Sequence, residues 1–424
     1  MSCQQSLNIL ISGCGIAAPV LAYWLLRANP LNTITILDRD PEIRLTGASV
    51  DIRSSAVDII KWMAVEEEIR KHTTNEEGIQ WIDATGKPIA TMRATGRTDI
   101  QSFTSEFEIF RGELAKIFLV TVLDRVNVIY NETVEKYQEL EDGVEVTLTM
   151  SKNMVRYDVL VAADGFGSKI RGMMLNAPSR DQVFDEGVHI AYFTLKKDLL
   201  QGGKYAKWYS TTGGRCVLVR PDPSPEGRTR ANLMTVTTKK DVGTKKRLND
   251  ALAKGNNAFM DVMSDMYKDV GWLTPEILKG MRESDDFYCS LFGQIRSPHL
   301  CTKRVVLLGD AGYATPGIGT SLAIIGAYVL AGELATTPDH IPAALKRYEA
   351  LMQPFVKSHQ GGVGEIAMQL MVPQTRLAIS IRNAFLFTFM GLKLDRVVMR
   401  AAAWMGFSEK KLAMPDYPWT KNEG

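Results

Sequence analysis

The chain has 424 residues, 45% of them hydrophobic, which is long enough for two domains with sizeable cores. Fifty Lys and Arg residues nearly balance 48 Asp and Glu residues, so the net charge of +2 does not indicate a nucleic-acid or strongly acidic partner. The five cysteines include no C-x-x-C pair and the five histidines no ligand-spaced cluster, which argues against disulfides and a metal site and favours a cytoplasmic location.

The first residues, MSCQQSLNIL, lack both the basic segment and the long apolar segment of a signal peptide. The most apolar late stretch, residues 383–392, is bounded by Arg382 and Lys393 and is too short to cross a bilayer. We therefore expect no transmembrane segment.

The N-terminal region predicts a βαβ unit. Residues 7–12 (LNILIS) and 33–37 (TITIL) are typical of buried strands, and residues 16–28 of an apolar helix between them. This unit is the usual start of a dinucleotide-binding fold.

A Gly-rich turn, Gly13-x-Gly15-x-x-Ala18, connects the first strand to the helix. Gly13 permits the tight turn, Gly15 lets a pyrophosphate approach the backbone, and Ala18 lets the helix pack closely on the strand. The helix N-terminus attracts phosphate. Asp38, after the second strand, can accept hydrogen bonds from ribose hydroxyls and would repel a 2′-phosphate. The alternative is a Gly-rich loop in an unrelated α/β fold.

A second turn of the same kind follows the predicted strand 157–162. It carries one acid, Asp164, followed by Gly165. Its ordinary explanation is an Asx-type turn in which Asp164 caps the next helix. Upstream, residues 108–123 predict a helix that opens near Arg111, and residues 144–150 predict a strand.

Residues 185–237 alternate between apolar and polar positions and contain Gly- and Pro-rich turns, which predicts an antiparallel sheet. Helices are expected at about 244–268 and 274–282.

A third turn follows the predicted strand 304–308 and precedes an apolar helix at about 321–334; helices are expected to continue to about residue 412. Asp310 can bind ribityl hydroxyls, and Gly317 and Gly319 leave backbone N–H groups free to face a phosphate or a flavin ring. Pro316 stiffens the segment. The alternative is a Gly-rich connector to a core helix.

In order and spacing, over about residues 5–360, the three turns resemble those of the class A FAD-dependent monooxygenases of the para-hydroxybenzoate hydroxylase type. Within this class the chain is most similar to the tetracycline-inactivating flavin monooxygenases and related polyketide-modifying enzymes. The resemblance implies an α/β fold in which a Rossmann-like FAD-binding domain (1–72, 105–175 and 295–360) carries an inserted β-rich substrate domain (73–104 and 176–294). C-terminal bracing helices (361–424) follow.

The resemblance also implies roles for individual residues. Asp38 would hold the adenosine ribose, Arg111 the ribityl chain or the pyrophosphate, and Asp310 the ribityl chain. Arg44 would serve in the use of NADPH or NADH, and Asp51 would lie beside the flavin. The complete set of expected cofactor-binding residues is Gly13, Gly15, Ala18, Asp38, Arg39, Arg44, Asp51, Arg111, Asp164, Gly165, Asp310, Pro316, Gly317 and Gly319.

Several of these residues also have ordinary explanations. Arg111 could pair with Glu108 or Glu113, Asp51 could be a turn or cap residue, and Arg44 could be solvated. The third turn departs from the family pattern GDAAHxxxPxxGxG, because it reads GDAGYATPGIG and places Tyr313 where His is common.

The implied reaction starts with hydride transfer from NADPH or NADH to FAD. The reduced flavin captures O2 as a C4a-hydroperoxide, which transfers one oxygen atom to an aromatic, polyketide-like or other electron-rich small molecule. Hydroxylation in secondary metabolism or antibiotic inactivation is the expected setting, with the protein a monomer or weak dimer.

The sequence identifies no catalytic side chain. Expected substrate contacts on the β-rich insertion are Tyr192, Trp208, Tyr209, Arg215 and Arg220, although core packing explains each of them equally well.

Two other functions remain open from the sequence. The chain could be a flavin oxidase or dehydrogenase of the same fold, without oxygen insertion, or a non-catalytic FAD-binding interaction protein. A flavin halogenase is disfavoured because the chain contains no W-x-W-x-I-P stretch.

Overall fold

The protein is described by a computed structural model. The described residues are 6–45, 47–74, 76–93, 107–224, 226–361, 365–392, 394, 411–417 and 419. Residues 94–104 of the expected substrate domain and residues 395–410 of the expected helical tail lie outside this part of the chain.

The first sheet has five parallel strands in the order β17-β11-β1-β2-β7. Its strands are short and strongly apolar, and most of their side chains are fully buried, as expected for a parallel sheet covered on both faces. The strands are β1 (Asn8–Ser12), β2 (Thr33–Leu37), β7 (Asn127–Ile129), β11 (Val159–Ala162) and β17 (Val305–Leu307).

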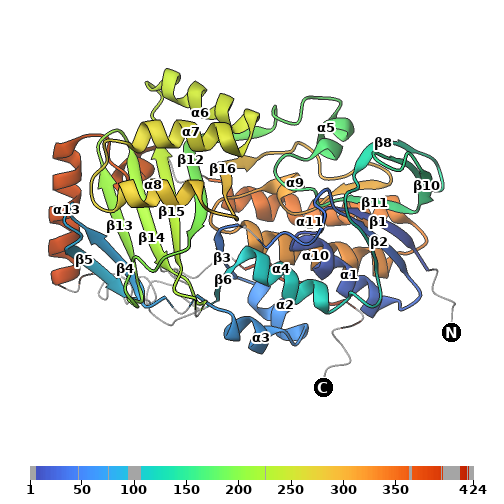
Figure 1. Cartoon of the computed structure of the whole chain (residues 1–424). Coiled ribbons are helices and arrows are strands. Elements are labelled where there is room, and N and C mark those ends of the chain that lie inside the picture. Colours follow the sequence, from blue (N-terminus) through green and yellow to red (C-terminus); the bar gives the residue numbers. More distant parts are fainter. Residues whose placement is uncertain are drawn as a thin grey trace.

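Two helices far apart in sequence, α1 (Ala17–Ala28) and α10 (Gly319–Thr336), pack against each other on one face of this sheet. The other face packs against a three-stranded meander of β8 (Val134–Glu139), β9 (Val144–Leu148) and β10 (Met154–Tyr157). Figure 1 shows this half of the molecule on the right. The predicted βαβ unit and the later return of the chain to the same sheet are both confirmed.

Further helices surround the first sheet. They are α2 (Ala56–Trp62), α3 (Glu66–Lys71), α4 (Arg111–Val120), α5 (Lys169–Leu175), α9 (Asp310–Tyr313) and α11 (Ile341–His359). The prediction of a helix from residue 108 is wrong at its start. Residues 108–110 form β6 (Glu108–Phe110), which pairs antiparallel with β3 (Ser49–Asp51), and the helix begins at Arg111.

The second sheet has seven strands in the order β16-β12-β15-β14-β13-β4-β5, antiparallel except where β13 runs parallel to β4. Its strands are β4 (Gly78–Ile82), β5 (Pro88–Arg93), β12 (Val183–Leu195), β13 (Tyr205–Thr211), β14 (Arg215–Pro221), β15 (Thr229–Val236) and β16 (Tyr288–Ile295). The expected antiparallel insertion is therefore confirmed, and β16 is an edge strand that the sequence patterns did not indicate.

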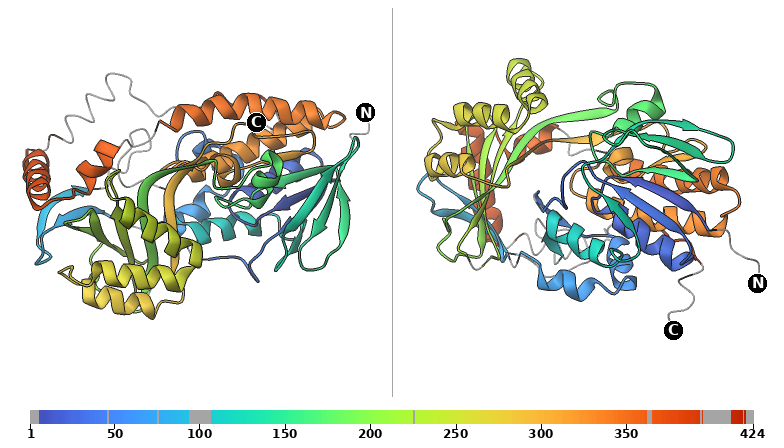
Figure 2. Two further views of the ribbon diagram at one scale, coloured as in Figure 1. Left: turned by 90° about the horizontal axis from the view of Figure 1, so that it is seen from above. Right: turned by 45° about the vertical axis from the view of Figure 1, so that its right-hand side comes forward.

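Three helices cover one face of the second sheet: α6 (Val242–Lys254), α7 (Asn256–Tyr267) and α8 (Thr274–Arg282). The single helix expected at 244–268 is interrupted at Gly255, whose φ of +103° ends α6. Two C-terminal helices, α12 (Glu365–Met371) and α13 (Arg376–Gly391), contribute side chains to the core on the opposite face. Figure 2 shows α13 beside β5, at the end of the molecule opposite the first sheet.

Among the described helices, α10 alone is long and apolar enough to span a membrane by length and composition. It is packed inside the protein, and its residues from Ser321 to Leu334 are all buried. We therefore assign α10 to the core. In contrast, α13 has no buried residue and exposes Phe385 and Phe387.

Candidate active site

The three turns predicted from the sequence meet at one edge of the first sheet. Gly13 follows β1, Asp164 follows β11, and Gly309 follows β17, and these three strands are neighbours. Backbone hydrogen bonds hold the turns in register, with Ala163 N donating to Ser12 O at 2.8 Å. In a parallel sheet the edge at the C-terminal strand ends is where nucleotides bind.

The first turn is shaped for close approach to its neighbours. Gly13 has a φ of +105°, and a Cβ added there would stand 2.3 Å from the carbonyl oxygen of Ala163. Only glycine fits this position. The following helix α1 has no side-chain cap on its first turn in the part of the chain that the structure describes, so its N-terminal N–H groups are open to a phosphate.

Asp38 lies against this turn at the end of β2. Its carboxylate accepts hydrogen bonds from Cys14 N at 2.6 Å and from Asp40 N at 2.9 Å. The side chain is only partly buried, so its remaining acceptor capacity can be used by a ribose. Arg39, next in sequence, is exposed and lies 3.9 Å from the Asp40 carboxylate.

Arg111 begins α4 and lies across the first turn. Its Nη2 is 3.3 Å from the position of a Cβ on Gly15, and its aliphatic carbons are 3.5 Å from the corresponding position on Gly47. Glu108, considered above as its partner, instead pairs with Arg220. Arg111 is thus placed beside the open N-terminus of α1, where an anion is expected.

The third turn brings Asp310 to the start of α10. Asp310 is open to a central cavity although protein surrounds it, and its Oδ1 lies 3.3 Å from where a Cβ on Gly319 would stand. Burial raises the pKa of Asp310, whereas the positive charge of Arg111 lowers it. Asp310 and Arg111 are therefore near enough to act on the same ligand.

The second turn, which carries Asp164 and Gly165, lies behind the lining of the cavity. Asp164 accepts a hydrogen bond from Lys169 N at 3.1 Å, but Ser168 is the N-cap of α5, with its Oγ accepting from Arg171 N. The buried Oδ1 of Asp164 has no hydrogen-bond partner among the described residues, and burial raises its pKa. Gly165 has a φ of +80° and turns the chain toward the cavity.

Arg171 connects the second turn to the third through hydrogen bonds. It is fully buried, and it donates hydrogen bonds to the carbonyl oxygens of Ala311 at 2.7 Å, Phe166 at 2.9 Å and Ser179 at 2.7 Å. A buried guanidinium that satisfies carbonyl groups fixes loop geometry. Burial lowers the pKa of Arg171.

A cavity of about 880 Å³ lies between the two large sheets. Its first wall comes from the nucleotide-binding turns and from β3, and consists of residues Ala48, Ser49, Val50, Asp51, Arg111, Phe166, Gly167, Asp310, Ala314, Thr315, Pro316, Gly317, Gly319 and Thr320. Its second wall comes mainly from β12, β16 and α6, and consists of residues Ser179, Arg180, Val183, Asp185, Tyr192, Asn249, Leu252, Tyr288, Cys289, Ser290, Leu291, Phe292 and Gly293.

Six consecutive residues of β16, Tyr288 to Gly293, line the cavity. Successive side chains on a strand point to opposite faces, so the cavity reaches both faces of β16. This is compatible with its position at the edge of the sheet.

Arg44 connects the two walls. Its guanidinium lies 5.2 Å from the centre of the Tyr288 ring, and Tyr288 stacks on Tyr192 with 6.1 Å between ring centres. Burial lowers the pKa of Arg44, and the neighbouring charge of Arg111 lowers it further. Arg44 and Arg111 thus form a positively charged pair beside the cavity.

Of the five expected substrate contacts, only Tyr192 lines this cavity. Trp208 is buried under α12 and donates to Ser210 Oγ at 2.9 Å. Tyr209 packs on Trp272 on the opposite face of the sheet. Both aromatic side chains therefore lie in core packing, outside the lining of this cavity.

The two expected arginines also lie outside the cavity lining. Arg215 pairs with Asp269 at 2.5 Å, on the helical side of the sheet. Arg220 pairs with Glu76 at 2.8 Å and with Glu108, and so joins β14 to β6. Each guanidinium is therefore already satisfied by carboxylates.

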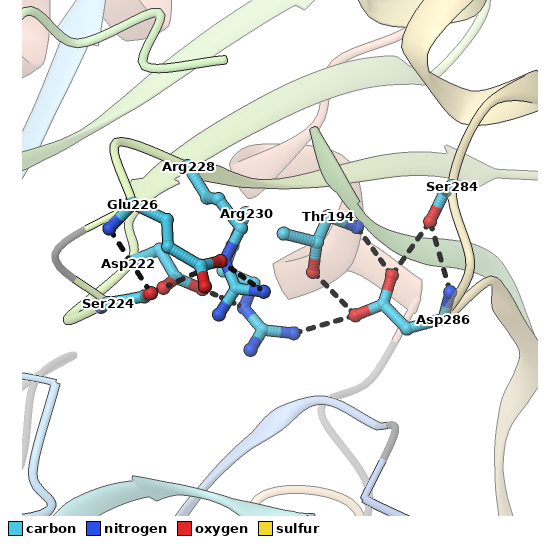
Figure 3. Close-up of polar contacts among 8 residues, drawn as sticks. All are labelled: Thr194, Asp222, Ser224, Glu226, Arg228, Arg230, Ser284 and Asp286. Carbon is cyan, nitrogen blue, oxygen red and sulfur yellow. Dashed lines mark hydrogen bonds and ion pairs between the residues drawn. The ribbon is translucent and has the colours of Figure 1, made fainter. Parts of the chain in front are cut away.

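A second arginine, Arg230, ties the sheets together close to Arg220. It binds Asp222 at 2.6 Å and Asp286 at 2.8 Å (Figure 3). Its guanidinium also lies 4.1 Å from the centre of the Phe110 ring on β6. Asp286 also accepts hydrogen bonds from the N–H and hydroxyl of Thr194. These contacts fix the second wall relative to the first.

Tyr313, at the family's usual His position, points away from the cavity. It is buried between α10 and α11, and its hydroxyl lies 3.0 Å from that of Tyr348. The tyrosine that replaces the family's usual His in the third turn is therefore accommodated in the core.

The cavity-lining residues that the sequence patterns did not identify are on β16 and α6, namely Tyr288, Phe292 and Asn249. The β16 sequence YCSLFGQI has no clear alternation of apolar and polar residues, so no local pattern indicated these contacts.

The residues present fit the expected FAD. An uncapped helix N-terminus and Arg111 complement a pyrophosphate, and Asp38 and Asp310 supply acceptors for ribose and ribityl hydroxyls. Among the described residues no group of His, Cys, Asp or Glu has the arrangement of a metal site.

No protein-family model matches the chain. Curated relatives span almost its full length. A flavin-dependent monooxygenase of Legionella longbeachae is 30% identical, with 84% of this chain and 88% of the relative covered. The FAD-dependent monooxygenase asL4 of Sarocladium schorii is 29% identical, with 98% and 99% covered. Among solved structures, tetracycline destructase Tet(55) superposes with a TM-score of 0.72 at 26% identity, covering 91% of this chain and 96% of that one.

Proposed function

This chain belongs to the flavin-dependent monooxygenases, and we propose that it inserts one oxygen atom of O2 into an aromatic, polyketide-like or other electron-rich small molecule, with NADPH or NADH as reductant. It is an oxidoreductase with FAD as its cofactor. The observation that carries the proposal is the cavity of about 880 Å³, which has the cofactor turns on one wall and aromatic side chains on the other. Its volume is within the usual range for small-molecule sites.

We propose that FAD is held by the fourteen residues named from the sequence, with Arg111 and the N-terminus of α1 at the pyrophosphate and Asp38 and Asp310 at the sugar hydroxyls. When bound, FAD supplies the redox chemistry with O2. The protein residues then have to bind, orient and exclude water. Arg171 fixes the second and third turns, and the buried contacts of Arg220 and Arg230 hold the two walls together.

We propose that the substrate rests on the second wall, against Tyr192, Tyr288 and Phe292. This wall is largely apolar and aromatic, which suits a planar substrate. Asn249 and Asp185 provide polar groups at its far side, where Asp185 pairs with Lys245 at 3.0 Å and Asn249 lies 2.9 Å from His189 Nε2. The domain division given above, a monomeric or weakly dimeric state and a cytoplasmic location are part of the proposal.

The test is a screen of phenols, enols and polycyclic polyketides with the FAD-loaded protein, following NADPH and NADH oxidation together with product mass. We expect a substrate to stimulate oxidation and to gain one oxygen atom, labelled when ¹⁸O2 is supplied. A product oxidised without label would replace the proposal with an oxidase or dehydrogenase. Failure of both nicotinamide cofactors to reduce the flavin would favour a non-catalytic FAD-binding protein.

A further inference from the structure

Two carboxylates face each other on the short β3–β6 ribbon. Asp51 on β3 is the direct cross-strand partner of Glu108 on β6. Directly opposite residues have Cβ atoms about 5 Å apart, and like charges in such a pair are destabilising. A pair of acids at this position therefore needs compensation.

The compensation supplied by neighbouring cations is incomplete. Arg53 pairs with Asp51 at 2.5 Å, and Arg220 pairs with Glu108 and with Glu76, whose contact is 2.8 Å long. The cluster thus contains three carboxylates and two guanidinium groups. All five groups are buried or nearly so, and one negative charge is left without a counterion within the cluster.

Each member of the acid pair also has one oxygen atom without a partner. Asp51 Oδ1 and Glu108 Oε2 are buried and accept no hydrogen bond from any described residue. Buried acceptors of this kind are costly. A single proton on one of the two carboxyl groups would provide a donor between them and would also remove the excess charge.

The direction in which the pKa values of two acids in this cluster are shifted also favours a bound proton. Burial raises the pKa of Asp51, and Glu108 raises it further, against the opposing effect of Arg53 and Arg220. Burial likewise raises the pKa of Glu76 against the effect of Arg220.

We propose that Asp51 and Glu108 share one proton through their two unpartnered oxygen atoms, and that Asp51 is thereby kept neutral beside the bound FAD. Asp51 lines the central cavity, whereas Glu108 is behind it on β6. Asp51 is then the group that touches the ligand, and Glu108 is a positioning residue that sets when Asp51 is neutral. The other charged groups that line the cavity are Arg111, Arg180, Asp185 and Asp310, and Arg44 lies beside it. The identity of the ligand as FAD rests on the proposed function.

The test measures FAD affinity against pH by flavin fluorescence, using the full-length protein. A neutral Asp51 adds no charge at the cavity, whereas an ionised Asp51 adds negative charge beside an anionic ligand. In the unmodified protein, affinity should therefore fall as the pH rises and Asp51, whose pKa is raised by burial, loses its proton.

Two isosteric variants separate the members of the pair. Asp51→Asn keeps a donor but cannot ionise, so this fall in affinity should disappear. Glu108→Gln removes the like charge, so the midpoint should move down by about one pH unit. Glu135→Gln, at an exposed pair with Lys152 on β8, should keep the profile of the unmodified protein.

An unchanged midpoint in Glu108→Gln would overturn the proposal, because a midpoint that belongs to Asp310 does not depend on Glu108. If Glu108→Gln does not fold, Glu76→Gln replaces it, since Glu76 carries a charge of the same cluster and its removal should lower the midpoint too. Absence of FAD binding in the unmodified protein at every pH would instead refute the proposed function. FAD binding without a change in these variants would refute the shared proton alone.

Discussion

The guanidinium of Arg111 lies over Gly15, with its Nη2 only 3.3 Å from the point that a Cβ on Gly15 would occupy. The two residues come from different structural units, the first turn of the parallel sheet and the start of α4. Their contact puts a positive charge beside the N–H groups at the start of α1, so the phosphate site has two independent sources of attraction.

Arg111→Gln should weaken FAD binding by roughly 10- to 100-fold, or about 1.4–2.7 kcal/mol, because a charge-assisted contact to phosphate is lost. Titration of the protein with FAD, followed by flavin fluorescence, measures this change. The melting temperature without FAD should stay nearly unchanged, since none of the described carboxylates forms an ion pair with Arg111. Arg156→Gln, which breaks only a surface pair with Asp142, is the control and should bind FAD normally. Equal FAD affinity in both variants would contradict the proposed role of Arg111.

Gly13→Ala should destabilise the protein by about 3 kcal/mol or more. The new Cβ would stand 2.3 Å from the backbone oxygen of Ala163, and the φ of +105° is unfavourable for alanine. Gly243→Ala is a matched control in the first turn of α6, because no atom lies within 4 Å of its added Cβ. It should be neutral or stabilise by up to about 1 kcal/mol. Urea unfolding followed by circular dichroism compares the two, and similar stability would contradict the packing of the first turn.

The parts of the structure that the sequence predicted are those with a local pattern. Residues 7–12, 33–37 and 304–308 are apolar or β-branched runs, the first and third of them followed by glycine turns, and such runs form buried parallel strands whatever their partners are. The turn residues Gly13 and Asp310 were identifiable because a backbone close approach and a carboxylate at a strand end are requirements of the turn itself.

Four of the five expected substrate contacts lie outside the cavity lining for a physical reason. Trp208 and Tyr209 are adjacent on β13, so they point to opposite faces, and neither faces the cavity. Arg215 and Arg220 find carboxylates from distant segments, Asp269 and Glu108, which no local pattern reveals. The edge strand β16 follows three helices and pairs with β12, about a hundred residues upstream, so its place in the site depends on tertiary structure.

Glu132 should make the stability of the protein depend on acid pH. Its carboxylate accepts hydrogen bonds from the backbone N–H groups of Thr133 at 3.0 Å, Met150 at 2.8 Å and Ser151 at 2.9 Å. Burial raises the pKa of Glu132, but these hydrogen bonds outweigh it and lower the pKa to about 2.

A carboxyl group with a lowered pKa in the folded state stabilises the protein above its unfolded pKa of about 4.3, and this stabilisation is lost as the pH falls toward 2. Glu132→Gln should therefore cost on the order of 2 kcal/mol at pH 7 and much less near pH 2. Urea unfolding at both pH values measures the difference. Glu135→Gln, at an exposed ion pair on the nearby strand β8, should cost little at either pH. A pH-independent loss in Glu132→Gln would mean that packing, rather than ionisation, explains it.

Tyr288 and Tyr209 offer a matched pair of aromatic residues on the second sheet. Tyr288 lines the cavity, stacks on Tyr192 and lies under Arg44, whereas Tyr209 packs on Trp272 away from the cavity. With a substrate identified by the screen, Tyr288→Leu should raise KM by about 10-fold, or about 1.4 kcal/mol, because an aromatic contact to a planar substrate is lost. Tyr209→Leu should leave KM unchanged, although the stability of that variant should fall through lost packing.

The ratio of product formed to NADPH or NADH consumed should also fall in Tyr288→Leu alone, since a loosely held substrate leaves the reduced enzyme to react with O2 unproductively. A larger effect on KM in Tyr209→Leu would place the substrate on the helical face of the sheet and overturn the assignment of β16 to the substrate wall.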